Sequence, residues 1–416
     1  MRYQPLPAKF HADRRRQFMA QLPAGAVAIM DTNVQLVRSR DTHMPFRPDS
    51  YFYYLTGLDR PGAVLVLAGS EEWLFIAETD EQMRLWDGEA YTLVEAKALS
   101  GVAQVAWLRE LPARLRQLVR PGASVYLNYT DAPGLPEAAY APGALRARAL
   151  RRPARGLRVS SARPALAAMR LIKQPAELAQ LRQAAAITAA GFAQARRALR
   201  PELREYQLEA EFTAAFIAGG AAGHAYEPIV AGGPNATVLH YVRNDRPLAA
   251  GQLVLADVGA EYGWYAADVT RVWPVDGRLT PRQREIYQAV LEVQRAAIVL
   301  MRPGALMRDI EQAAGRHLTE QLVQLGILTR AQVTAKGGHQ LYRAYCPHAI
   351  SHSLGLDVHD VGDLSRPLQP GMVLTCEPGI YLKAEGLGVR LEDDILVTSH
   401  QPENLTVAIP IDPELL

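Results

Sequence analysis

The chain contains 416 residues, of which 49% are hydrophobic and 21% are charged, a composition typical of a soluble globular protein with two domains. A net charge of +2 predicts no particular attraction to nucleic acid or to anionic membranes. No run of about 18 apolar residues is present to span a bilayer, and the N-terminus lacks the apolar segment of a signal peptide. The two cysteines, Cys346 and Cys376, exclude a disulfide framework and fit a reducing compartment, so we expect a cytoplasmic protein.

Residues 1–172 are expected to form an α/β domain with a mixed sheet. A short amphipathic helix is predicted over 13–22. Short apolar runs bounded by Gly, Pro or Asn predict strands at 26–30, 63–67, 72–76 and 124–127. The segment 153–164 is rich in Pro, Gly, Arg and Ser, and we interpret it as the connection to a second domain.

Residues 173–416 are expected to form an α+β domain of antiparallel hairpins with helices packed on one side. Helical periodicity predicts helices over 175–199, 202–218, 281–301 and 308–325. Thr280, Pro281 and Gln283 have the spacing of a capping box at the start of the third helix. Strands are predicted at 253–257, 265–273, 372–376 and 389–398.

Two acidic residues occupy the first of these hairpins. Asp257 ends an apolar strand, and Asp268 lies in the next one. If the turn is centred between Tyr262 and Gly263, the two acids lie directly opposite each other, with Cβ atoms about 5 Å apart. This distance suits carboxylates that share metal ions roughly 3.5–4 Å apart.

A second pair of acids, Glu377 and Glu392, is related in the same way by a hairpin centred near Ala384 and Glu385. Acids at strand ends are commonly surface residues. Here, however, all four are embedded in apolar strands, where a carboxylate is costly unless it is paired or bound to metal. Two divalent cations would neutralise the four charges.

Three histidines, His348, His352 and His359, lie within 12 residues and are interleaved with glycine and apolar positions. This pattern predicts a segment that lines a polar site, although the spacing does not select which histidine binds metal. His240 stands alone, and an isolated histidine is more often a hydrogen-bonded structural residue. Carboxylates and imidazole without thiolate favour Mn²⁺-like cations over a sulfur-bound zinc site.

The chain resembles the pita-bread metallopeptidases, and most closely the bacterial Xaa-Pro aminopeptidases (aminopeptidase P). In the second domain the matching segments are His240-Tyr241, Asp257, Asp268-Val-Thr-Arg271, His348-x-x-x-His352, Val358-His359-Asp360, Pro370-Gly-Met-Val-Leu-Thr-Cys-Glu377-Pro-Gly and Val389-Arg390-Leu-Glu392. In the first domain they are Arg14-Arg-Arg-Gln17 and Tyr51-Phe-Tyr-Tyr-Leu-Thr-Gly57.

The resemblance implies a creatinase-like N-terminal domain, a pita-bread catalytic domain and a dinuclear metal centre. Asp257 would bind one metal, Asp268 and Glu392 would bridge both, and His352 and Glu377 would bind the second. It also implies that His240, His348 and His359 contact the substrate and that Arg390 supports the acidic cluster. Trp86 matches a position that reaches a neighbouring subunit's site in some members of the family.

The activity implied by the resemblance is release of the N-terminal residue from peptides with proline at position 2. The nucleophile would be a hydroxide bridging two divalent cations, most readily Mn²⁺, with Co²⁺, Fe²⁺ or Zn²⁺ as alternatives. Glu377 would transfer the proton, His359 would stabilise the oxyanion, and His240 would hold the peptide. The resemblance also implies a homodimer or a homotetramer.

Other functions compete with this interpretation. A prolidase-type dipeptidase would use the same metal chemistry on Xaa-Pro dipeptides. A pita-bread protein that has lost catalysis would act as a binding scaffold, and a creatinase-like amidinohydrolase would need no metal. The presence of all five ligand positions in the sequence disfavours the last two.

Overall fold

The computed structural model describes the chain except for residues 1, 89, 130–140, 152–155, 336 and 416. The described chain divides into two units. The N-terminal unit contains residues 5–169, and the larger unit contains residues 170–416 together with residues 1–4. The division falls within helix α7 (Arg163–Leu171), and the predicted domain boundary after residue 172 follows the end of this helix. Residues 153–155 of the predicted connection lie outside the described part of the chain.

The N-terminal unit contains a six-stranded sheet with the strand order β6-β5-β4-β1-β7-β8. The central strand β1 pairs antiparallel with β4 and parallel with β7, which confirms the predicted mixed sheet. The strands are β1 (Val27–Asp31), β4 (Ala63–Ala68), β5 (Glu71–Ile76), β6 (Gln104–Trp107), β7 (Ser124–Leu127) and β8 (Arg158–Ser161). A separate short hairpin joins β2 (Val37–Ser39) and β3 (Thr42–His43).

The helices of this unit are α1 (Ala8–Ala20), α2 (Ser50–Thr56), α3 (Glu81–Asp87), α4 (Leu93–Ser100), α5 (Leu111–Leu118), α6 (Pro142–Leu150) and the first part of α7. Helix α1 begins five residues before its predicted start at 13, directly after Pro7. Pro7 is the N-cap of α1, and its missing backbone N–H removes no hydrogen bond from the helix.

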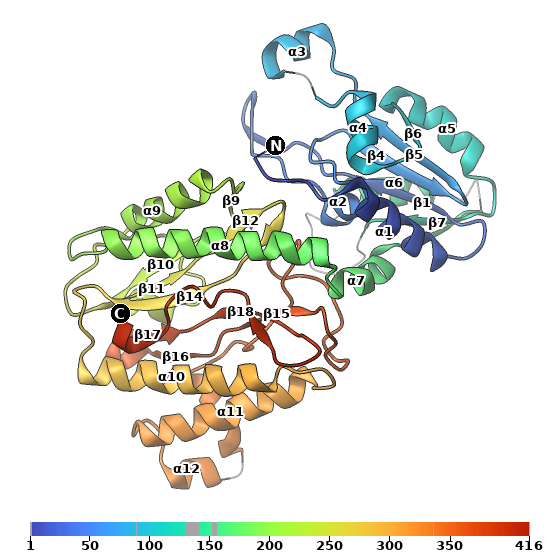
Figure 1. The fold of residues 1–416 in the computed structure, drawn as a ribbon. Coiled ribbons are helices and arrows are strands. Elements are labelled where there is room, and N and C mark those ends of the chain that lie inside the picture. Colours follow the sequence, from blue (N-terminus) through green and yellow to red (C-terminus); the bar gives the residue numbers. More distant parts are fainter. Residues whose placement is uncertain (1, 89, 130–140, 152–155, 336, 416) are drawn as a thin grey trace. The chain divides into compact units, whose positions relative to one another are not determined.

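The larger unit places its strands between two pairs of helices (Figure 1). The helices are α8 (Pro175–Ala198), α9 (Glu205–Ala218), α10 (Pro281–Leu300), α11 (Met307–Gln324) and the short α12 (Arg330–Thr334). The strands are β9 (Gly223–His224), β10 (Ile229–Gly232), β11 (Leu253–Asp257), β12 (Ala260–Tyr262), β13 (Tyr265–Ala266), β14 (Thr270–Pro274), β15 (Val373–Cys376), β16 (Gly379–Leu382), β17 (Leu387–Arg390), β18 (Asp393–Leu396) and β19 (Glu403–Asn404). The capping box of Thr280 and Gln283 at the start of α10 is confirmed.

Helices cover both faces of these strands, so the prediction of helices on one side was wrong. In β11, Leu253 and Leu255 join the core formed with α10 and α11, whereas Val254 and Ala256 join the core formed with α8 and α9. Successive side chains of a strand point to opposite faces. The continuous apolar run of β11 is therefore the pattern of a strand buried on both sides.

The first hairpin has a register that differs from the predicted one. Tyr262 pairs with Tyr265 and Asp257 pairs with Thr270, so the turn is centred between Gly263 and Trp264, one residue later than predicted. Both turn residues have positive φ, 57° and 68°. Positive φ is uncommon for tryptophan, but here the Trp264 indole donates a hydrogen bond to the Tyr3 hydroxyl, which helps to hold the turn.

The corrected register still leaves the two aspartates on one face. Asp268 lies opposite Gly259, and Asp257 lies two residues before that glycine, so the acids are diagonal rather than direct neighbours. Diagonal neighbours remain within reach of a shared ligand. Gly259 permits a close approach of the two strands, because a Cβ atom there would lie 1.7 Å from the Ala267 carbonyl oxygen.

The second hairpin has the predicted register. Cys376 pairs with Asp393 in one ladder, and Gly379 pairs with Arg390 in the next. These pairs flank Glu377 and Glu392 on both sides, and the same register sets the two glutamates opposite each other. The prediction for the longer hairpin is thus confirmed.

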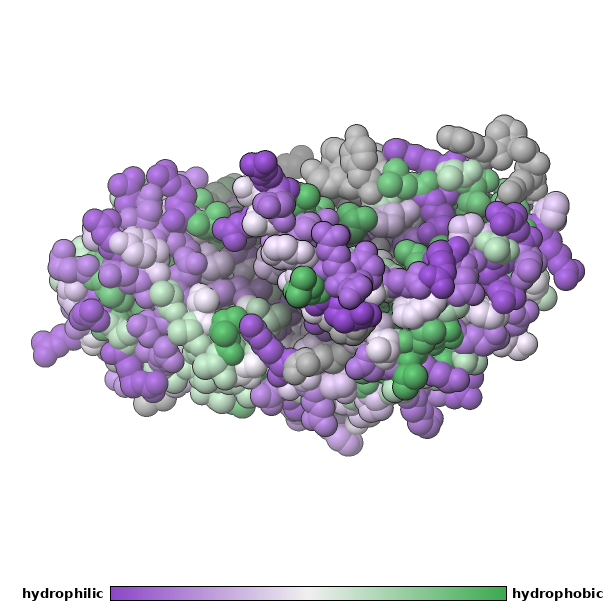
Figure 2. Space-filling model, turned by 90° about the horizontal axis from the view of Figure 1, so that it is seen from above, coloured by the Kyte–Doolittle hydropathy of each residue, from purple (hydrophilic) through white to green (hydrophobic). Residues whose placement is uncertain are grey.

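On the face shown in Figure 2, hydrophobic residues are scattered among hydrophilic ones. Among the residues that the structure describes, no helix has both the length and the apolar character needed to cross a membrane.

Replacing Gly259 with alanine is expected to lower the free energy of unfolding by about 1–3 kcal/mol, because the added methyl group would force the two strands apart. Chemical denaturation measures this loss. Gly219→Ala is the control, since its Cβ would lie 3.0 Å from the Ile187 side chain and 3.3 Å from the Ala215 carbonyl oxygen, and the backbone there is helical. Equal stability of the Gly259→Ala variant and the original protein would contradict the close approach.

Candidate metal centre

A cavity of about 530 Å³ opens in the larger unit where the ladders of the two hairpins are interrupted. Nine of the site residues predicted from the sequence line it. They are Asp257, Asp268, His352, Glu377, Glu392, His240, His348, His359 and Arg390.

The four acids occupy strand ends or short interruptions between strands. Asp257 is the last residue of β11, and Asp268 lies between β13 and β14. Glu377 lies between β15 and β16, and Glu392 lies between β17 and β18. Asp257 therefore ends a regular strand, and the other three acids lie just outside the regular strands, between the ladders that hold them.

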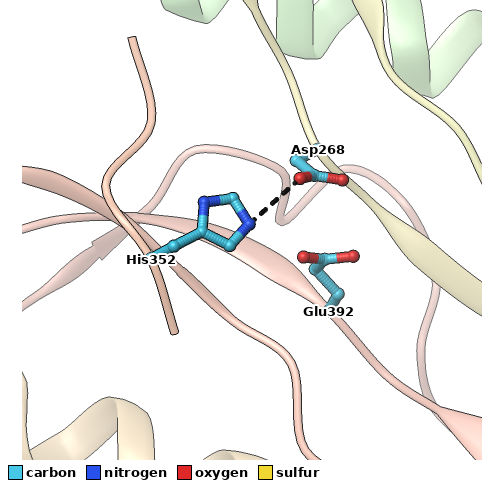
Figure 3. Close-up of side chains that lie close together, drawn as sticks. All are labelled: Asp268, His352 and Glu392. Atoms are coloured by element: carbon cyan, nitrogen blue, oxygen red, sulfur yellow. Dashed lines mark ion pairs between the residues drawn. The ribbon is translucent and has the colours of Figure 1, made fainter. Parts of the chain in front are cut away.

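Three candidate ligands form a compact group. One ligand atom each of Asp268, His352 and Glu392 lies within 4.8 Å of the others (Figure 3). His352 Nε2 is 3.4 Å from Asp268 Oδ2 and 3.5 Å from Glu377 Oε1. Asp257 and Glu377 lie outside the compact group but line the same cavity.

The hydrogen bonds of His352 suit a metal ligand. Its Nδ1 lies 3.0 Å from the Ser353 carbonyl oxygen, which can only accept, so Nδ1 carries the proton. Nε2 faces the carboxylates, and its lone pair becomes available to a metal ion when its own proton is released, which is the usual arrangement of a metal-binding histidine. The backbone N–H of His352 also donates to Thr375 Oγ1 at 3.1 Å, which fixes the segment.

Further polar contacts hold the acids. Tyr226 donates to Asp257 Oδ1 at 2.7 Å, and Thr270 donates to Glu392 Oε2 at 2.7 Å. The buried Arg390 guanidinium contacts Asp257 and donates from Nε to Thr270 Oγ1 at 3.1 Å. One arginine thus links the first aspartate to the residue that supports Glu392.

The negative charge of the four acids exceeds the positive charge of the groups around them. Burial raises the pKa of Glu377 to about 7, with added repulsion from the two aspartates. Burial and repulsion from neighbouring carboxylates raise the pKa of Glu392 well above its usual value, and burial raises that of Asp268. Burial alone would lower the pKa of His352, but Asp268 and Glu377 raise it to about 9. An excess of oxygen donors with one imidazole fits hard divalent cations.

The remaining histidines lie around this cluster. His348 Nε2 is 2.9 Å from the Tyr381 hydroxyl, and its Nδ1 is 3.6 Å from Glu377 Oε2. The His359 ring lies 4.5 Å from that of His352. Burial lowers the pKa of His348 to about 4 and lowers that of His359, so both are neutral at pH 7. His240 is exposed at the cavity wall.

Trp86 belongs to the N-terminal unit, where α3 leaves it 76% exposed, and it is not among the residues that line the cavity. Conversely, sequence reasoning missed the hydroxyl groups of Tyr226, Thr270, Thr375 and Tyr381. Thr270 could have been found, because it lies two residues after Asp268 and hence on the same face of the strand. Tyr226 carries no such signal, since it lies outside both hairpins.

Comparisons with known proteins agree with this geometry. Residues 179–399 match the model of metallopeptidase family M24, and residues 11–126 match the N-terminal domain of aminopeptidase P. The Xaa-Pro aminopeptidase of Haemophilus influenzae is 36% identical, over 97% of this chain and 95% of that protein.

Two solved structures cover nearly the whole chain. The aminopeptidase P of Escherichia coli matches with a TM-score of 0.89 and 35% identity, over 99% of this chain and 98% of that one. A putative aminopeptidase P from Bacillus anthracis matches with a TM-score of 0.92 and 31% identity, over 99% and 97% of the two chains. The chain therefore belongs to metallopeptidase family M24.

Proposed function

We propose that this enzyme removes the N-terminal residue from peptides that have proline at position 2. The observation that carries the proposal is the meeting of four acids and His352 in one cavity, in a chain similar to Xaa-Pro aminopeptidases along most of its length. The apolar side chains of Ile229, Leu239 and Val242 in the same cavity offer a surface for a proline ring.

In this proposal Asp257, Asp268, His352, Glu377 and Glu392 would together hold two divalent cations. When bound, the cations would lower the pKa of a shared water molecule and polarise the scissile carbonyl. The oxygen-rich donor set supports Mn²⁺. The two cysteines near the site, Cys346 and Cys376, are buried, so neither offers an exposed thiol that would favour a softer metal.

Side chains around the metal site carry out the proton transfer, the oxyanion stabilisation and the binding of the peptide. Glu377 is a carboxylate that lines the cavity beside His352, and it is suited to accept a proton and pass it to the leaving proline nitrogen. His359 is neutral at pH 7 and can donate a hydrogen bond to the developing oxyanion. His240 and His348 line the path of the peptide, and the substrate amino group would lie near Asp257.

The proposal also includes the oligomeric state of the enzyme and its compartment. We infer a homodimer or homotetramer in which Trp86, 76% exposed on α3, contacts a peptide bound to a neighbouring subunit. We place the enzyme in the cytoplasm, where the two cysteines would stay reduced.

The substrate assignment is tested with three peptides: Ala-Pro, Ala-Pro-Ala and Ala-Ala-Ala. With Mn²⁺ added, Ala-Pro-Ala is expected to release free alanine and Pro-Ala, while Ala-Ala-Ala stays intact. Mass spectrometry of the products measures this. Cleavage restricted to Ala-Pro would identify a prolidase-type dipeptidase instead, and binding of all three without cleavage would identify a scaffold.

Glu377→Gln is expected to lower kcat by about 100-fold or more, because the amide cannot accept the proton. Circular dichroism should show an unchanged fold, since glutamine has the shape of glutamate. Glu385→Gln is the matched control, because this half-exposed glutamate pairs with Arg282 in the turn of the same hairpin. A Glu377→Gln enzyme as fast as the original would refute the proton-transfer role.

Metal-free protein is expected to lose stability as the pH rises from 7 to 9. His352 has a folded pKa of about 9, and Glu392 titrates well above its usual value. The folded protein therefore holds protons that the unfolded chain has already released, so its stability falls as the pH rises toward the folded pKa values.

Bound Mn²⁺ replaces these protons, so the Tm of metal-loaded protein should fall less over the same interval. Differential scanning calorimetry at pH 7, 8 and 9 compares the two samples. The difference between the two slopes of Tm against pH reports the metal site alone, because the buried cysteines titrate in both the metal-free and the metal-loaded sample. Equal slopes would show that the cluster does not exchange protons for metal.

A further inference from the structure

Two buried cations at the junction of α7 and α8 hold residues 357–360, the segment that contains His359. Arg170 lies 2.5 Å from Asp360 Oδ1, and Lys173 Nζ lies 3.1 Å from Asp360 Oδ2. All three side chains are 1% exposed. Arg170 also contacts Asp357 Oδ2 at 2.7 Å, so the same cation holds two points of the segment.

The backbone of Asp360 reaches the candidate ligand His352. Its N–H donates to the Ser353 carbonyl oxygen at 2.8 Å. The same oxygen accepts the Nδ1 proton of His352 at 3.0 Å. One carbonyl therefore joins the residue next to His359 to the ring that faces the carboxylates.

Close packing leaves this arrangement little freedom. A Cβ atom on Gly355 would lie 2.2 Å from Asp360 Oδ2, and one on Gly362 would lie 2.4 Å from Leu171 Cδ1. The Lys173 backbone N–H donates to the Gly371 carbonyl at 2.8 Å. The segment thus lies directly against residues 171–173, with no space for an added methyl group at these glycines.

We propose that Asp360, held by Arg170 and Lys173, is a positioning residue that sets both His352 and His359 for metal binding and catalysis. A neutral side chain at this position removes the carboxylate that pairs with Lys173 and one of the two that pair with Arg170, and the segment must move to solvate these buried cations. Movement shifts the Ser353 carbonyl, and with it the ring of His352. The role in catalysis depends on the proposed function, whereas the role in metal binding does not.

The first test measures Mn²⁺ affinity by isothermal titration of metal-free protein. Asp360→Asn is expected to weaken Mn²⁺ binding by about 10–100-fold, the usual effect of removing a group that orients a metal ligand. At saturating Mn²⁺, kcat for Ala-Pro-Ala is expected to fall by a similar factor with little change in KM, because His359 is displaced. Loss of all hydrolysis in the original protein would refute the proposed function but leave the affinity measurement intact.

Gly355→Ala provides a second variant that alters no charge. Its methyl group would displace the Asp360 carboxylate from Lys173, so it should reproduce the weaker Mn²⁺ binding and the lower kcat. The Gly355 backbone is not left-handed, so alanine adds only the steric conflict. This variant keeps the proposal testable if Asp360→Asn fails to fold.

Asp31→Asn is the matched control. Asp31 is 5% exposed and pairs with Arg146 in the N-terminal unit, where Arg146 Nε donates to Asp31 Oδ2 at 2.7 Å. This variant should lose stability while its Mn²⁺ affinity stays within about twofold, because Asp31 belongs to the other unit and takes no part in the candidate site. Unchanged affinity and kcat in folded Asp360→Asn, or equal losses in Asp31→Asn, would overturn the positioning role.

Discussion

The concentration of negative charge at the interruptions of two hairpins is the constraint on which the larger unit depends. Four largely buried carboxylates converge there, and the Arg390 guanidinium and the His352 ring offset only part of their charge. Such a cluster is tolerable only when it takes up protons or binds cations. The helices on both faces of the strands supply the apolar packing that holds the acids together despite their repulsion.

The sequence predicted the second hairpin better than the first, for a physical reason. The pairing of Glu377 with Glu392 follows from symmetry about Ala384 and Glu385, and the ladders on both sides keep that symmetry. The first turn depends on Trp264 in a left-handed conformation, which propensity disfavours and which a contact with Tyr3 supports. A contact between residues 261 positions apart cannot be inferred from local pattern.

The choice among the histidines illustrates a second limit of sequence reasoning. Spacing indicated that His348, His352 and His359 line one site, and all three do. His352 and His348 both hold Nδ1 against the carbonyl oxygen of the next residue, so this contact does not distinguish them. What distinguishes His352 is that its Nε2 faces Asp268 and Glu377, whereas Nε2 of His348 faces the Tyr381 hydroxyl. The group that each Nε2 faces is set by contacts between distant parts of the sequence, so this difference exists only once the chain is folded.

Buried arginines recur around the site, and their cost suggests what they do. Arg271 donates to the Glu392 carbonyl at 2.6 Å and to Asp393 Oδ1 at 2.6 Å, while Arg390 contacts Asp257. Buried ion pairs add little net stability compared with apolar packing of the same volume. An apolar side chain, however, could not fix the direction of a carbonyl or a carboxylate. The arginines around this cavity are therefore best understood as fixing the geometry of acids that would otherwise separate.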